Sequence, residues 1–159
     1  MKYNKKNKII ILMFLMLFTN TMNALNTNSI VMPIEKLIKT FGITSIEKSL
    51  LNRAKYSYSA GKLIAKRNNT FFPHIKDAIG RTNIERMKSG IAPIGKDGKS
   101  IELHHLKQKD NGIIVELTSQ EHNINSKILH QYKTTSEIDR QSFNAFKRQY
   151  WRNRAKDFE

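Results

Sequence analysis

The sequence contains no cysteine among its 159 residues. Without thiols the chain can form no disulfide framework, no cysteine-ligated zinc or iron–sulfur site and no cysteine nucleophile. Any metal must therefore be bound by histidine, carboxylate, carbonyl or water ligands. This absence directs attention to the five histidines, four of which lie between positions 104 and 130.

Acidic residues are also scarce, because 13 Asp and Glu stand against 28 Lys and Arg, for a net charge of +15. Such an excess indicates a polyanionic partner, either nucleic acid or an anionic membrane. The hydrophobic fraction of 39% is enough for a packed core, and the length suits one domain with an extension. The first 24 residues carry four lysines and no acid, whereas residues 80–159 carry 15 basic and ten acidic residues.

Long hydrophobic runs are missing as well, since the longest, residues 9–18 (IIILMFLMLF), has ten residues. It follows a lysine-rich start and precedes a polar stretch that ends at Ala24, which is the order of a secretory signal peptide. Ten helical residues rise only about 15 Å, half of a hydrocarbon core. We therefore predict a signal peptide over residues 1–24 and a secreted or periplasmic mature protein that acts outside its maker's cytoplasm or in another cell. An uncleaved anchor, favoured by the bulky Met22, is the alternative and the only predicted membrane contact.

Residues 25–79 are predicted to be a helical basic segment or linker. Apolar residues recur there at helical spacing, with Gly42 ending a first run that begins near Pro33. The second run and its continuation are Ile46, Leu50, Leu51, Ala54, Tyr58, Leu63 and Ile64. A helical hairpin that packs on the next domain is favoured over a basic amphipathic arm for membrane, DNA or a delivery partner.

From Gly90 onward the pattern changes to strand, loop, strand and helix. Asp97-Gly98 and Asn111-Gly112 are turn signals, and the two short apolar strands are expected at 101–106 and 113–117. The sequence Thr118-Ser-Gln-Glu121 is typical of a capping box, which starts a helix at about residue 119.

This order brings histidines of the first strand against the helix. His104 and His105 are adjacent on a strand, so their side chains point to opposite faces. One of the pair can bind a metal that faces the helix, where His122 supplies a second ligand, while the other acts as a general base. Phosphodiester hydrolysis needs this combination of a base, a positioned water and a cation that stabilises the developing charge.

The stretch from residue 80 to about residue 158 resembles the LHH group of the HNH/endonuclease VII superfamily of bacterial nuclease toxins. The resemblance covers about half of the chain and is carried by ordered pieces rather than by the histidine pair alone. These pieces are 80–87 (GRTNIERM), 92–95 and 97–98, 102–106 (ELHHL), 116–118, 121–122, 129–130, 138–140, 150–151 and 154–155.

The resemblance implies a ββα-metal fold, metal-dependent cleavage of nucleic acid, and a toxin role that is often paired with an immunity protein. By position, His104 and His122 resemble metal ligands and His105 resembles the general base. His130 is a further participant that binds metal or phosphate. It lies eight residues after His122, about 80° round an ideal helix. It therefore joins the site only if the helix ends early and the chain turns, and a helix-terminal or core position is the alternative.

Two other parts of the family pattern are matched less directly. The family's loop-pinning asparagine has two candidates, Asn111 and Asn123. A final amphipathic helix over 136–158 carries an apolar stripe and a basic remainder. The candidate phosphate-binding arginines are Arg81, Arg86, Arg140, Arg148, Arg152 and Arg154. For the first two and Arg140 the alternative is an ion pair with Glu85, Glu102 or Asp139.

The sequence therefore predicts an α+β protein with a ββα-metal core and flanking helices, preceded by a helical N-terminal segment. Its predicted function is that of a metal-dependent endonuclease with one divalent ion (Mg²⁺ or Zn²⁺), DNA favoured over RNA as substrate. Residues 80–159 form the predicted nuclease domain. A nucleic-acid-binding module with a structural metal is the alternative, and the presence of His105 beside His104 argues against it.

Overall fold

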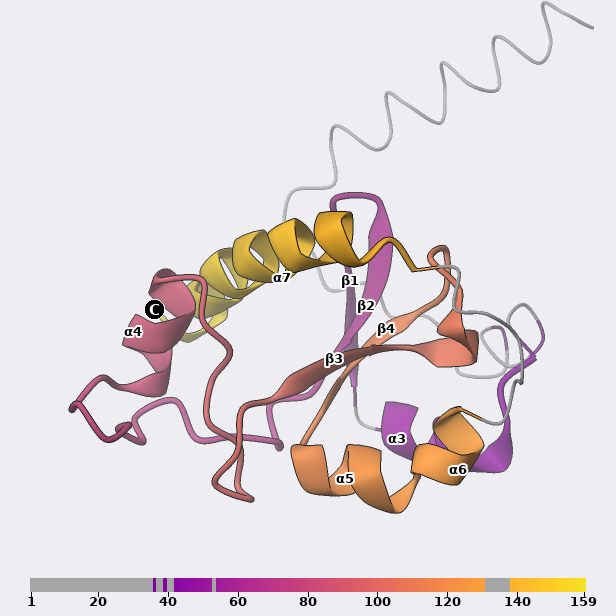
Figure 1. Cartoon of the computed structure of the whole chain (residues 1–159), viewed down its shortest axis with the longest axis horizontal. Helices are drawn as coiled ribbons and strands as arrows, with labels where there is room; N and C mark the ends of the chain where they lie inside the picture. Colours follow the sequence, from indigo (N-terminus) through magenta and orange to yellow (C-terminus); the bar gives the residue numbers. More distant parts are fainter. Residues whose placement is uncertain (1–35, 37–38, 40–41, 53, 131–137) are drawn as a thin grey trace, which may run out of the picture.

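The computed structural model describes residues 36, 39, 42–52, 54–130 and 138–159 (Figure 1). Within them a four-stranded sheet has the order β1-β2-β4-β3. The β1–β2 and β3–β4 pairs are antiparallel, and β2 and β4 are parallel. The strands are β1 (Lys55–Ser59), β2 (Lys62–Lys66), β3 (Glu102–His105) and β4 (Ile114–Leu117).

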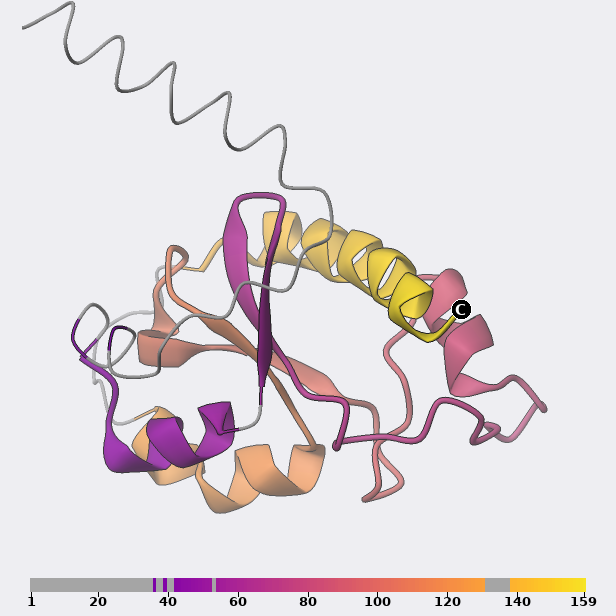
Figure 2. The ribbon, with the colours of Figure 1, turned by 180° about the vertical axis from the view of Figure 1, so that it is seen from behind.

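Helices lie on both faces of this sheet. Helix α7 crosses one face, and α3, α5 and α6 lie on the other, as the two opposite views agree (Figures 1 and 2). The helices are α3 (Ser45–Leu51), α4 (Asn83–Lys88), α5 (Ser119–Ile124), α6 (Ser126–Leu129) and α7 (Arg140–Ala155), with 3-10 turns at Leu106–Gln108 and Lys156–Phe158. The predicted α+β class with a ββα-metal core, here β3–β4–α5, is confirmed.

Two cores follow from the alternation of side chains along the strands. On β4, Val115 packs in the core under α3 and α6, whereas its neighbour Ile114 packs in the core under α7. On β3 the same alternation sends His104 toward α5 and His105 toward α7. The two histidines therefore occupy opposite faces of one strand, as the sequence predicted.

The prediction of helix across residues 55–66 is wrong, because these residues form the β1–β2 hairpin. Ala60 and Gly61 have φ values of 46° and 76°, which makes the tight two-residue turn of a twisted hairpin. β2 is covered on both faces and pairs with β4, so its apolar run comes from a buried strand. Only the start of the second predicted helical run, from Ile46 to Leu51, is helical, and it lies in α3, which is capped by Thr44. The helix expected near residues 33–41 falls mostly outside the described residues.

The turn and capping signals of the second half are confirmed. Gly95 N donates to Lys99 O at 2.7 Å and Gly98 has a φ of 75°, which closes the Asp97-Gly98 turn. Thr118 and Glu121 form the predicted capping box of α5. The final helix expected over 136–158 is observed as α7, which begins at Arg140 behind the capping Asp139, and it ends in the 3-10 turn at Lys156–Phe158.

Arg154 is one predicted nucleic-acid contact that the fold places in the core. It is 1% exposed, and its Nε donates to Glu116 Oε1 at 2.8 Å. Tyr150 donates its hydroxyl to the same oxygen at 2.6 Å. Because the Glu116 carboxylate is fully buried, it needs this cation as its counterion. Arg154 therefore ties α7 to β4, which corrects its assignment to a nucleic-acid surface.

No helix in the described part of the chain is long and apolar enough to span a membrane. The predicted signal peptide at residues 1–24 lies outside the described residues.

Candidate metal centre and active site

Three histidines from three different elements converge on one point. His104 comes from β3, His122 from α5 and His130 from the C-terminal end of α6. Each offers one ring nitrogen, and these three nitrogens all lie within 4.8 Å of one another. The ring centroids are 4.9 Å apart for His104 and His122, and 5.2 Å apart for each of the other two pairs. The predicted ligand set is thus brought together.

A break in the helix brings His130 into this group. Helix α5 ends at Ile124, and Asn125, at φ −94° and ψ 6°, separates it from α6. Asn125 donates its side-chain amide to Glu121 O at 2.8 Å, which satisfies a carbonyl at the end of the helix. The buried Leu129 then anchors α6, and the next residue is His130. The helix ends early and the chain turns, as the spacing of eight residues required.

Polar partners orient two of the three imidazoles from behind. Glu102 Oε2 lies 2.7 Å from His122 Nδ1, which leaves Nε2 of that ring for the metal. Gln108 Nε2 lies 3.1 Å from His130 Nδ1, and the Gln108 Oε1 is buried without a partner among the described residues. Rotation of this amide by 180° places Oε1 opposite Nδ1, so that Nδ1 carries the proton and Nε2 is free.

The imidazoles fit a metal ion in both geometry and charge. His122 Nε2 and His130 Nε2 lie 3.1 Å apart. Two nitrogens bound to one tetrahedral ion at about 2.0 Å lie about 3.3 Å apart. The Nε2 atom of His104 is buried with no hydrogen-bond partner in the described structure. Burial and the neighbouring histidines lower the pKa of His104 to about 3, and similar causes lower the pKa of His130, so both rings are neutral at pH 7 and ready to bind a cation.

His105 occupies the opposite face of β3 and has a different environment. Its ring packs edge-on against Phe143 of α7, with the ring centroids 4.4 Å apart. The residue is 2% exposed, and neither ring nitrogen has a hydrogen-bond partner among the residues described. Burial, followed by the charges of Lys62 and Arg140, lowers the pKa of His105 to about 4. The imidazole is therefore neutral near pH 7 and able to accept a proton.

A pocket of about 340 Å³ adjoins both the three-histidine cluster and His105. Its other wall is α7, which contributes Arg140, Asn144 and Lys147. These three residues follow the spacing i, i+4 and i+7, so they share one face of the helix. Two cations and an amide thus face the histidines across the pocket, which is an arrangement suited to an anionic ligand.

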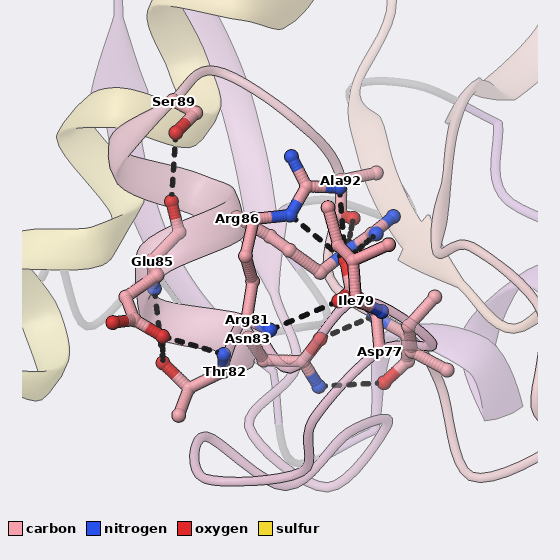
Figure 3. A network of polar contacts seen from close by, with 10 residues as sticks. Asp77, Ile79, Arg81, Thr82, Asn83, Glu85, Arg86, Ser89 and Ala92 are labelled. Atoms are coloured by element: carbon pink, nitrogen blue, oxygen red, sulfur yellow. Dashed lines mark hydrogen bonds and ion pairs between the residues drawn. The ribbon is translucent and has the colours of Figure 1, made fainter.

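Arg81 and Arg86 lie elsewhere, in a network around the carboxylate of Asp77 (Figure 3). Arg81 Nη2 and Arg86 Nη1 approach the same oxygen, Asp77 Oδ2, at 2.9 and 2.8 Å. Burial alone would raise the pKa of Asp77, but hydrogen bonds from the two arginines and from backbone amides hold it at about 2. The ion-pair alternative is therefore the one observed, with Asp77 in place of the partners that the sequence suggested.

The remaining predicted contacts do not line the pocket. Arg148 and Arg152 are exposed on α7 at the side that faces Gly90 of the loop after α4. Asn111 and Asn123 are exposed, in the turn before β4 and near the end of α5. The structure thus brings His104, His105, His122, His130 and Arg140 to one pocket and leaves these four residues away from it.

Sequence reasoning missed several residues that organise the site. Gln108 supports His130, and Asn144 lines the pocket. Glu102 could have been found, because it lies two residues before His104 and so shares its face of the strand.

Comparison with known protein families gives a match over the part of the chain that carries this site. A family model described as LHH, a nuclease of the HNH/ENDO VII superfamily with conserved LHH, matches residues 82–157. The matched stretch includes Leu103, His104 and His105, together with both helix-borne histidines of the cluster. No solved structure matches the chain.

Proposed function

We propose that this chain, whose residues 82–157 belong to the LHH family of HNH/ENDO VII nucleases, is a metal-dependent endonuclease that hydrolyses phosphodiester bonds, with DNA as the favoured substrate. One observation carries the proposal. Three imidazoles converge on one side of β3 and an unpartnered imidazole lies on the other, and both line the same pocket. A purely structural metal site has no need of the second feature.

In this proposal the four histidines have two different roles in the reaction. His105 accepts the proton of the attacking water at one of its two unpartnered ring nitrogens. His104, His122 and His130 would hold a divalent ion, which when bound stabilises charge on the phosphate and the leaving oxygen. Imidazole ligands suit zinc and similar transition ions better than magnesium, so we favour Zn²⁺ over Mg²⁺.

The α7 wall supplies the substrate-binding charge. Arg140 and Lys147 would bind the phosphates on either side of the scissile bond, and Asn144 would donate to a phosphate or sugar oxygen. Contacts of this kind read the backbone and not the bases, so we expect cleavage with little sequence preference.

Lys147→Ala tests this wall. We expect the variant to bind duplex DNA more weakly in the presence of chelator, with the slope of log affinity against log salt smaller by about 1. Arg148→Ala is the matched control, since it removes a cation from the next position of α7, which does not line the pocket. Fluorescence anisotropy over a salt series measures both. An equal change in the two variants would mean that the helix contributes only diffuse charge.

The biological role we propose is that of a secreted toxin, with a neutralising immunity protein in the producing cell. The signal-like leader and the basic sequence support it, because export would keep an active nuclease away from the maker's own nucleic acid.

The direct test of the activity is a cleavage assay. The purified chain is incubated with supercoiled plasmid, linear DNA or RNA, in Zn²⁺, in Mg²⁺ or in chelator. We expect nicking of plasmid that requires a metal and stops on chelation, with slower cleavage of RNA. Binding of DNA without cleavage under any metal would instead favour the alternative, a nucleic-acid-binding module with a structural metal.

A further inference from the structure

The segment before the matched domain forms part of the core beneath the metal centre. One hydrophobic cluster combines residues from both sides of the domain boundary predicted at residue 80. From the earlier side it includes Leu51, Tyr56 and Leu63, and from the later side Leu117 and Leu129. Helix α6, whose buried Leu129 directly precedes His130, thus rests on a surface built partly by residues 43–65.

Arg67, the residue that follows β2, makes a specific polar contact to α5. Its Nη1 and Nη2 donate to Glu121 Oε2 and Oε1 at 2.9 and 2.7 Å, which is a two-pronged guanidinium–carboxylate pair. Nη1 also donates to Glu116 O at 3.1 Å, and the Arg67 side chain is 7% exposed. One guanidinium thus joins the backbone of β4 to the first turn of α5.

This contact lies directly beside His122. Glu121 is its immediate neighbour and also caps the helix, because Glu121 Oε2 accepts from Thr118 N at 2.9 Å. Rotation or fraying of the first turn would move His122 away from both Glu102 and His104.

A second contact reaches the loop that supports His130. Lys107 and Gln108 have φ values of 62° and 55°, a left-handed conformation that costs free energy in non-glycine residues. Lys107 Nζ lies 3.4 Å from Glu47 Oε2 of α3, and Glu47 is 1% exposed. The next residue, Gln108, is the one that contacts His130. The buried Glu47 thus holds the strained loop from the earlier segment.

We propose that Arg67 and Glu47 are positioning residues of the metal centre, Arg67 for His122 and Glu47, through Lys107 and Gln108, for His130. Both precede residues 82–157, so the functional unit would extend beyond the matched domain. The proposal rests on the proposed function only in that the three histidines bind a metal. A lysine cannot reproduce the two-pronged pair, and a glutamine keeps the size of Glu47 but not its charge.

The test uses the full chain with Arg67→Lys and Glu47→Gln, and with Arg81→Lys as the matched control. Arg81 also forms a guanidinium–carboxylate pair, to Asp77, away from the histidines. Zn²⁺ affinity is measured by competition with a chromophoric chelator. We expect each positioning variant to bind Zn²⁺ roughly 10-fold to 100-fold more weakly, and the control to stay within about twofold of the parent. Parental affinity in both positioning variants, or an equal loss in the control, would overturn the proposal.

Nuclear magnetic resonance of the histidine rings in the metal-free protein provides a readout that does not depend on metal binding. We expect Arg67→Lys to shift the ring resonances of His122, and Glu47→Gln to shift those of His130, with the fifth histidine, His74, unchanged. If Arg67→Lys does not fold, Glu121→Gln replaces it, since the amide oxygen can still accept from Thr118. If the parent binds no Zn²⁺, the proposed function fails while these ring shifts still decide the positioning roles, and unchanged resonances would refute them.

Discussion

Replacement of His105 by alanine is expected to lower kcat/KM for plasmid cleavage by roughly 10²- to 10⁴-fold, which is the usual contribution of a general base. Zn²⁺ affinity should stay at the parental value, because His105 lies on the face of β3 opposite the three-histidine cluster. Cleavage rates at subsaturating DNA, with saturating metal, measure the first quantity, and chelator competition measures the second.

His105→Phe separates loss of the base from loss of packing. The ring of His105 packs against Phe143 with the centroids 4.4 Å apart, so alanine would also leave a cavity beneath α7. Phenylalanine keeps an aromatic ring in that position and removes both nitrogens. Equal loss of cleavage in the two variants assigns the effect to the nitrogens. Undiminished cleavage by His105→Phe would remove His105 from the mechanism.

The pH dependence of the parent gives a further measure of the same group. Only the neutral imidazole can accept a proton, and burial together with Lys62 and Arg140 lowers the pKa of His105 to about 4. A lowered pKa keeps the base neutral to lower pH. The acid limb of the kcat/KM profile should therefore fall near pH 4 instead of near 6.5, where an unperturbed histidine titrates.

Local sequence signals were enough for the ββα core, because they act within a few residues. The Thr118–Glu121 capping box, the Asp97-Gly98 turn and the alternation about His104 each specify a local backbone conformation, and the structure shows all three. The hairpin at residues 55–66 was misread because short apolar runs fit either a helix or a strand. These residues form strands because β2 pairs with β4, which lies some 50 residues later in the chain. No local sequence pattern indicates this pairing.

In the candidate site, too, local signals were readable from the sequence and long-range contacts were not. The order of strands and helix predicted that a histidine of the pair at 104–105 would meet His122, and the resemblance to the family added His130. The sequence did not separate phosphate-binding arginines from those in ion pairs, because an arginine's role depends on which carboxylate packs against it in the fold. Arg154 is separated from Glu116 by 38 residues and Arg86 from Asp77 by nine, and neither spacing marks a pair in the sequence. Gln108 lies in a loop whose left-handed conformation gives no compositional signal.

His122→Ala is the second substitution with a large expected effect. It removes one of three ligand nitrogens, so we expect Zn²⁺ affinity to fall by at least about 100-fold, beyond the effect of losing a supporting residue, and cleavage to fall with it. Thermal unfolding gives an independent readout. A metal that binds only the folded chain stabilises it by about 2.7 kcal/mol at 100 times its Kd. The parent should therefore gain a higher Tm on addition of Zn²⁺, and the variant should not.

Two further variants test whether the loss of Zn²⁺ affinity becomes smaller for side chains farther from the three-histidine cluster. Glu102→Gln keeps the shape of the side chain that lies 2.7 Å from His122 Nδ1 but removes its charge, so we expect Zn²⁺ to bind about 10-fold more weakly. His74→Ala removes the exposed fifth histidine, which lies outside the pocket, and should leave both Zn²⁺ affinity and the Tm shift unchanged. The expected order of affinity loss is His122, then Glu102, then His74. An equal loss from His74→Ala would mean that Zn²⁺ binds to surface imidazoles, and the converging nitrogens of β3, α5 and α6 would then lose their role as the metal centre.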